Sequence, residues 1–91
     1  MPTESSIVAR ICANLKRRGI WFEKSIGNAY SRRGRPDLMV IIKGFAFFLE
    51  IKRPGGKPTP LQEHRLAQLR AAGAVAAVVT SWEETAQLLN L

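Results

Sequence analysis

Hydrophobic residues recur along the chain at two spacings, and the change between them marks the predicted helices and strands. The first predicted helix has the three- and four-residue spacing of one helical face in four apolar residues: Ile7, Val8, Ile11 and Leu15. Thr3 or a neighbouring serine can cap this helix, and Gly19 ends it. Three runs rich in β-branched and aromatic residues follow, and they predict strands at residues 20–24, 37–42 and 45–52.

The second half of the chain returns to helical spacing. Thr59 can cap a helix with Pro60 in its first turn, and Gly73 ends that helix. Four apolar residues form its predicted buried stripe: Leu61, Leu66, Leu69 and Ala72. The helix follows a segment rich in proline and glycine, residues 53–58, which breaks the strand pattern before it.

A last strand and a last helix complete the order. Residues 74–79 predict a buried strand, and the spacing of Ser81 and Glu84 is that of a capping box at the start of a helix through Leu89. Because the last strand follows a helical crossover, it can lie parallel to a neighbour. We therefore expect an α/β domain in the order α-β-β-β-α-β-α, with a mixed central sheet flanked by helices.

The connection between the second and third strands fixes which side chains face each other. A two-residue connection at Lys43 and Gly44 favours a tight antiparallel hairpin, in which Asp37 faces Glu50. Strand alternation adds Lys52 to the same face. Carboxylate oxygens are preferred ligands of Mg²⁺ and Mn²⁺, and a neighbouring ammonium can hold a water beside such an ion. The alternative is a structural cluster of surface charges at the strand ends.

Charge narrows the class of partner. The 91 residues, enough for one domain over residues 1–91, carry a formal net charge of +7, and such an excess attracts polyanions. Residues 31–57 hold seven Lys and Arg against two acids, so this third of the chain is the expected contact face. Nucleic acid is the leading partner, with a merely solubilising surface as the alternative.

Several classes of protein lack support in the sequence. Apolar runs are too short for a membrane helix and no signal peptide is visible, so we expect a cytoplasmic protein. The single Cys12 suits a reducing compartment, and the single His64 leaves no histidine-based zinc site or catalytic triad. Pro58 stands where a phosphate-binding loop after Lys57 needs Ser or Thr, so no nucleotide cofactor is expected.

Three segments, residues 34–38, 48–53 and 56–62, resemble the PD-(D/E)XK nuclease superfamily and, within it, the virus-type replication-repair nuclease (VRR-NUC) domains. The resemblance implies a restriction-endonuclease-like core. It also implies a role for six residues, namely metal binding by Asp37, Glu50, the Ile51 carbonyl and Glu4, catalysis by Lys52, and ordering of the site by Gln62. From the residues alone, Glu4 can instead be a solvated acid at a helix N-terminus, and Gln62 an ordinary capping residue.

The resemblance implies a stand-alone, Mg²⁺- or Mn²⁺-dependent DNA endonuclease. We expect structure-selective cleavage of branched or four-way DNA, a homodimer whose surface includes the last helix or Trp82, and a viral or phage source. Phosphate contacts, which carry no base information, are expected from five basic residues: Arg32, Arg33, Arg35, Arg53 and Lys57. Tyr30 or Trp21 can stack on an unpaired base, although packing is the favoured role of Trp21. The main alternative is a non-catalytic nucleic-acid-binding module.

Overall fold

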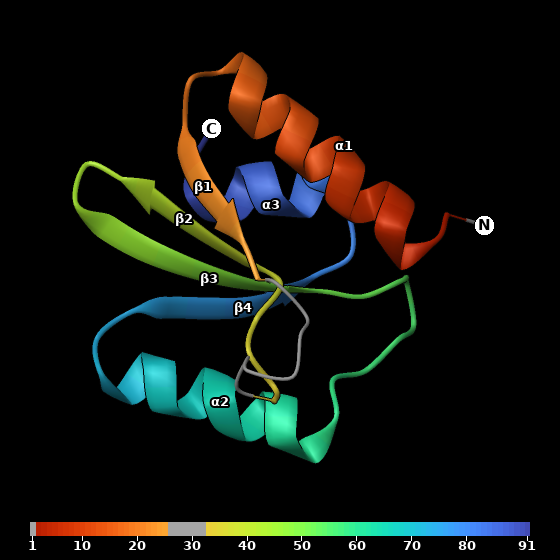
Figure 1. The fold of residues 1–91 in the computed structure, drawn as a ribbon, viewed down its shortest axis with the longest axis vertical. Helices are drawn as coiled ribbons and strands as arrows, with labels where there is room; N and C mark the ends of the chain where they lie inside the picture. The colour runs from red at the N-terminus through yellow and green to blue at the C-terminus, as the bar shows by residue number, and fades with distance from the viewer. Residues whose placement is uncertain (1, 26–32) are drawn as a thin grey trace.

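The structure is a computed structural model that describes residues 2–25 and 33–91. Within these ranges the chain forms three helices and four strands in the predicted order (Figure 1). Their bounds are α1 (Glu4–Arg17), β1 (Trp21–Lys24), β2 (Leu38–Ile42), β3 (Phe45–Ile51), α2 (Pro60–Ala71), β4 (Val75–Val79) and α3 (Trp82–Leu89). None of the helices in the described ranges combines the length and apolar character needed to cross a bilayer.

The sheet has the order β1-β2-β3-β4, with antiparallel pairs up to β3 and a parallel pair between β3 and β4. Lys43 and Gly44 have positive φ angles of 50° and 84°, the conformation of the tight hairpin turn that the sequence predicts. The predicted register is confirmed, since Ile42 pairs with Phe45 and Leu38 pairs with Leu49. Helix α2 provides the crossover that makes β4 parallel to β3.

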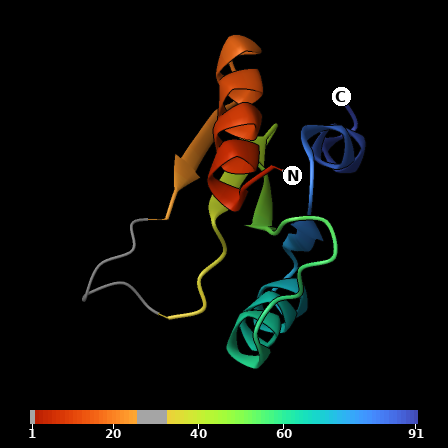
Figure 2. The same ribbon diagram turned by 90° about the vertical axis from the view of Figure 1, so that its right-hand side faces the viewer.

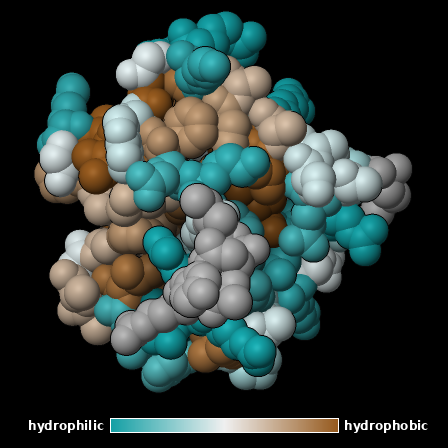
Figure 3. All heavy atoms as spheres, viewed as in Figure 1, coloured by the Kyte–Doolittle hydropathy of each residue, from teal (hydrophilic) through white to brown (hydrophobic). Residues whose placement is uncertain are grey.

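Helices cover the two faces of the sheet unequally. Helices α1 and α3 lie together on one face, and α2 lies on the other, near β4 (Figures 1 and 2). The core between the sheet and helices α1 and α3 is built of ten buried residues: Ile7, Ile11, Leu15, Leu38, Val40, Leu49, Ile51, Val79, Trp82 and Leu89. On the α2 side, Trp21 of β1 and its partner Ile41 stay 50% and 37% exposed. Figure 3 shows hydrophobic side chains gathered on the side of the molecule where the strands lie.

Helices α1 and α2 begin at the capping residues that the sequence predicts. Thr3 and Ser6 form a reciprocal capping box at α1, in which each side chain accepts the backbone N–H of the other. Thr59 and Gln62 form the equivalent box at α2. At α3 the predicted box is only half formed, because the Glu84 carboxylate accepts hydrogen bonds from the backbone and hydroxyl of Thr80 instead of closing on the cap.

Three residues differ in burial from what the sequence led us to expect. Leu61 is 41% exposed, and its side chain lies against Gly34 in the segment that leads into β2. Ala72 is exposed as well, since it caps the end of α2. Trp82 cannot supply an exposed dimer surface: its side chain is buried against the core, and the Arg18 guanidinium lies 5.3 Å from the centre of its ring.

Candidate active site

Asp37 lies directly before β2 and is fixed to the neighbouring strand. Its Oδ2 accepts a hydrogen bond of 2.7 Å from the backbone N–H of Ile51, the last residue of β3. Its carbonyl accepts the N–H of Ser25, just after β1, at 2.9 Å. The buried Pro36 before it also accepts the Ser25 hydroxyl. Three consecutive strands therefore determine where this carboxylate sits.

Glu50 is the one acidic side chain buried among the described residues, with 2% exposure. It lies on the face of β3 opposite the core residues Leu49 and Ile51, as strand alternation requires. Its Oε2 accepts a hydrogen bond of 3.1 Å from Gln62 Nε2 and lies 3.6 Å from the Lys52 ammonium. Its other oxygen, Oε1, is buried and has no hydrogen-bond partner within the described residues.

The electrostatics of Glu50 reflect this setting. The pKa of the Glu50 carboxyl is raised to about 8, mainly by burial and also by the neighbouring Asp37 carboxylate, while the Lys52 ammonium acts in the opposite direction. A carboxyl group with this pKa is largely protonated at neutral pH unless a cation replaces the proton. The two acids are thus close enough to interact, as the predicted hairpin register requires.

Gln62 combines the two roles that its sequence position allowed. Its Oε1 accepts the backbone N–H of Thr59 at 2.8 Å, which closes the capping box of α2. Its Nε2 donates to Glu50. The start of α2 and the position of the buried carboxylate are therefore joined through one side-chain amide.

Glu4 is the one predicted metal ligand that lies on α1. It is exposed in the first turn of α1, and it shares the lining of a pocket of about 300 Å³ with Asp37, Lys24 and Ser25. Within the described ranges, no group of three His, Cys, Asp or Glu side chains converges tightly enough to hold a metal ion by itself. The structure thus places Glu4 on the same pocket as Asp37 without bringing it into a three-acid cluster.

Along the chain, the predicted phosphate-binding residues stand before Asp37 and after Lys52. Arg33 and Arg35 end the long loop before Asp37, while Arg53 and Lys57 follow Lys52, and all four are exposed. Arg32 and Tyr30 lie outside the described residues. Trp21 is 50% exposed, so the packing role favoured for it accounts for only part of its surface.

Sequence reasoning missed Arg65, which joins α2 to the described part of the loop before Asp37, residues 33–36, here called the basic loop. Its Nε donates to the Arg33 carbonyl at 3.4 Å, and its Nη1 donates to Gln68 Oε1 at 3.0 Å. Nearby, Gly34 has a φ of +79°, and a Cβ there would lie 2.8 Å from Leu61 Cγ. In the sequence, Gly34 is the only indication that the loop approaches the helix this closely.

The acids offer a suitable environment for a divalent cation. Burying a carboxylate oxygen without a partner is costly, and Glu50 Oε1 is such an oxygen, next to a second carboxylate. Oxygen ligands of this kind suit Mg²⁺ and Mn²⁺, and a cation there would satisfy the orphan oxygen and remove the repulsion between the acids. The residues present therefore fit a divalent metal.

The fold and the site together define a class. A mixed sheet in the order α-β-β-β-α-β-α, with Asp37 before the second strand and Glu50-Ile51-Lys52 at the end of the third, is the arrangement expected of PD-(D/E)XK-type nuclease domains. No family model and no curated protein sequence matches the chain.

Two solved structures do match it. One, titled "VRR_NUC domain", is 27% identical, with a TM-score of 0.80 over 98% of this chain and 97% of that one. The other, a "VRR_NUC domain protein", is 20% identical, with a TM-score of 0.84 over 98% of this chain and 86% of that one. The resemblance predicted from the sequence is confirmed: this chain has the VRR-NUC fold.

Proposed function

We propose that this chain is a Mg²⁺- or Mn²⁺-dependent DNA endonuclease that hydrolyses phosphodiester bonds. The observation that carries the proposal is the buried Glu50, whose unpartnered Oε1 lies beside Asp37 and whose Oε2 lies near Lys52. The likeness to VRR_NUC domains over nearly the whole chain supports the same activity.

In this proposal Asp37 and Glu50 hold the metal, and the Ile51 carbonyl and Glu4 are further candidate ligands. When bound, a divalent cation neutralises the scissile phosphate and lowers the pKa of a coordinated water. The Ile51 N–H and the Gln62 amide keep the two carboxylates in place, which saves reorganisation during the reaction.

Lys52 completes the reacting group. Its ammonium is largely shielded from solvent and lies 3.6 Å from Glu50 Oε2, so it has donors left for a water or a phosphate oxygen. Hydrolysis forms a P–O bond to the water oxygen and breaks the P–O bond to one sugar oxygen, which takes up a proton. Lys52 orients the water and stabilises the charge that develops on the phosphate oxygens.

The basic residues around the acids supply affinity without reading sequence. Contacts from Arg33, Arg35, Arg53 and Lys57 to phosphates, with Arg32 from the adjoining segment, position the strand. Tyr30, from the same segment, can stack on an unpaired base. Selectivity for branched or four-way DNA is part of the proposal, as is a homodimer, which would let two sites cut two strands symmetrically. Such a dimer would have to use residues other than Trp82.

The decisive experiment is cleavage of duplex, flap, splayed and four-way DNA with and without Mn²⁺. Wild-type protein should cut one or more of these only with the metal, whereas Asp37→Asn and Lys52→Ala should bind DNA and leave it intact. Glu83→Gln is the matched control, because Glu83 is an exposed acid paired with Arg10. Metal-independent binding with no cleavage of any substrate would instead identify a non-catalytic nucleic-acid-binding module.

A further inference from the structure

A separate pocket lies beside the acids, between β3 and α2. It has a volume of about 360 Å³, at the small end of the range for ligand sites. Six residues line it: Arg35, Pro36, Phe48, Arg65, Gln68 and Leu69. None of these except Arg35 has a role in the proposed chemistry, so the pocket is unexplained by hydrolysis alone.

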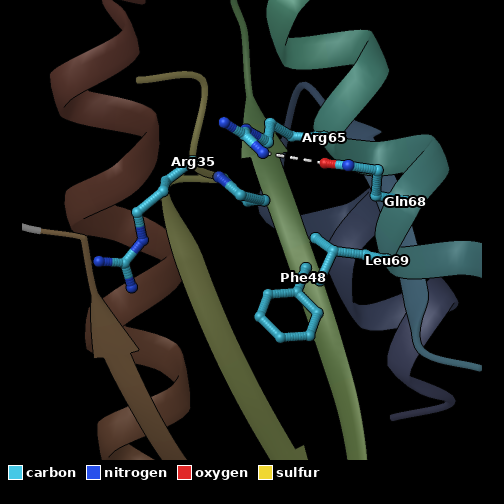
Figure 4. Close-up of a pocket in the computed structure, with 6 residues that line it drawn as sticks. Arg35, Phe48, Arg65, Gln68 and Leu69 are labelled. Carbon is cyan, nitrogen blue, oxygen red and sulfur yellow. Dashed lines mark hydrogen bonds between the residues drawn. The ribbon is translucent and has the colours of Figure 1, made fainter. Parts of the chain in front are cut away.

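The pocket has an aromatic and aliphatic base. Figure 4 shows the Phe48 ring in the space between Arg35 and Leu69, on the side of β3 that faces α2. Phe48 is only partly buried, and its neighbours Pro36 and Leu69 add apolar surface. A flat, partly exposed ring of this kind offers a stacking surface to another ring.

The rim of the pocket is cationic. Within the described ranges neither Arg35 nor Arg65 forms an ion pair with an acid. Arg65 is nevertheless held in place, because it donates to the Arg33 carbonyl and to Gln68 Oε1, the latter bond being drawn in Figure 4. An oriented guanidinium without an acidic partner is suited to bind a phosphate.

The pocket and the acids share one face of the sheet. Phe48 and Glu50 are two residues apart on β3, which places them on the same face and about 7 Å apart along the strand. Arg35 lies two residues before Asp37, in the segment that leads into β2. Since successive nucleotides of a strand are about 3.4 Å apart along a duplex axis, the pocket is one or two nucleotides from a phosphate at the acids.

We infer that this pocket takes one unpaired nucleobase next to the scissile phosphate, stacked on Phe48, with its backbone phosphate held by Arg65 and Arg35. The inference rests on the proposed function for the identity of the substrate. A base inside a duplex cannot reach Phe48 without leaving the stack, which costs free energy unless the base is already unpaired. The pocket thereby selects DNA with an unpaired nucleotide beside the cleavage site.

The test is a binding measurement that needs no catalysis. Asp37→Asn protein is titrated, by fluorescence anisotropy, with three labelled duplexes: fully paired, with one unpaired nucleotide, and with an abasic residue at the unpaired position. Base–aromatic stacking predicts that the unpaired base binds about 5- to 100-fold more tightly than its abasic counterpart. Equal affinity for these two duplexes overturns the inference.

Two further variants separate stacking from charge. Phe48→Leu keeps an apolar side chain, so the fold is expected to survive, but the preference for the base over the abasic residue should disappear. Arg65→Gln should weaken both unpaired duplexes alike and reduce the salt dependence by about one counterion. Lys16→Gln, the same charge change at the far end of α1, is the control. A preference unchanged in Phe48→Leu would place the base elsewhere.

The outcomes also distinguish the inference from the proposed function. If wild-type protein cuts DNA with Mn²⁺ but removing the base has no effect on binding, the endonuclease remains and the pocket has no such ligand. If the base preference is found and no DNA is cut under any condition, the pocket stands and the hydrolytic function fails.

Discussion

The two faces of β3 show opposite ways of burying a side chain. Leu49 and Ile51, both fully buried, face α1 and α3 within a continuous apolar core. Between them, Glu50 is equally inaccessible at 2% exposure, but it faces Asp37 and Lys52 and has an oxygen without a partner. One face lowers the free energy of the fold, whereas the other carries a cost that a bound proton or a bound cation must relieve. We therefore look for a binding site where a buried polar atom, such as Glu50 Oε1, has no hydrogen-bond partner among the described residues.

The largest effect we expect is on cleavage. Glu50→Gln retains an oxygen to accept from Gln62 and gains an amide that can donate to Asp37, but it removes a negative charge from the metal site. Cleavage rates with Mn²⁺ should fall by about 100-fold or more, by analogy with loss of other preorganised electrostatic groups. The unfolding temperature of the metal-free protein should stay the same or rise. A variant that unfolds and also loses activity would show that Glu50 is structural.

The matched change on the other face should have the reverse effect. Leu49→Ala removes a fully buried side chain from the core and should cost about 2–5 kcal/mol of stability. In a domain of this size each kcal/mol lowers the unfolding temperature by about 4–8 °C. Thermal denaturation followed by circular dichroism would check this, with Phe45→Ala, at an exposed position in the hairpin, as the control. Equal losses at both positions would contradict the buried core face.

Stability should depend on pH through the face of β3 that carries Glu50 and not through the apolar face that carries Leu49 and Ile51. The folded-state pKa of Glu50, about 8, is above the unfolded value of about 4.5, so the folded state binds the extra proton. Metal-free stability should therefore fall as pH rises from about 4.5 to about 8 and then level off. Unfolding temperatures measured across this range should show the decline, and Glu50→Gln should flatten it. Because metal competes with the same proton, Mn²⁺ should stabilise the protein more at pH 8 than at pH 6.

A smaller effect is expected where the basic loop meets α2. Gly34→Ala adds a Cβ in close contact with Leu61 at a φ of +79°, and the strain should cost about 1–3 kcal/mol. Gly55→Ala is the matched control, since Gly55 has a φ of +84° but no atom within 4 Å of its Cβ position. Denaturant titration should show a greater loss for Gly34→Ala. Equal losses would mean that only the φ angle matters.

Local chemistry made much of the fold and the acid pair predictable. A two-residue turn at Lys43 and Gly44 fixes the hairpin register, and the register alone brings Asp37 opposite Glu50. The capping boxes at Thr3 and Thr59 likewise depend only on residues three positions apart. These features need no knowledge of how distant parts of the chain pack.

The features that the sequence did not reveal depend on how α2 lies across the sheet. The exposure of Leu61, the link from Arg65 to the basic loop and the pocket beside Phe48 all follow from that one placement. Helical spacing identifies an apolar stripe but does not say how far the helix extends beyond the strands that cover it. At α3, Glu84 had the spacing of a box, but Thr80 offered it a competing pair of donors.

Gln62 has a consequence for how the protein fails on heating. The first turn of a helix is the part that frays most readily, and here that turn carries the amide that holds Glu50. Loosening a single turn thus releases a carboxylate of the proposed metal site while the core beneath α1 and α3 is still intact. On warming, DNA cleavage should therefore be lost below the temperature at which the whole domain unfolds.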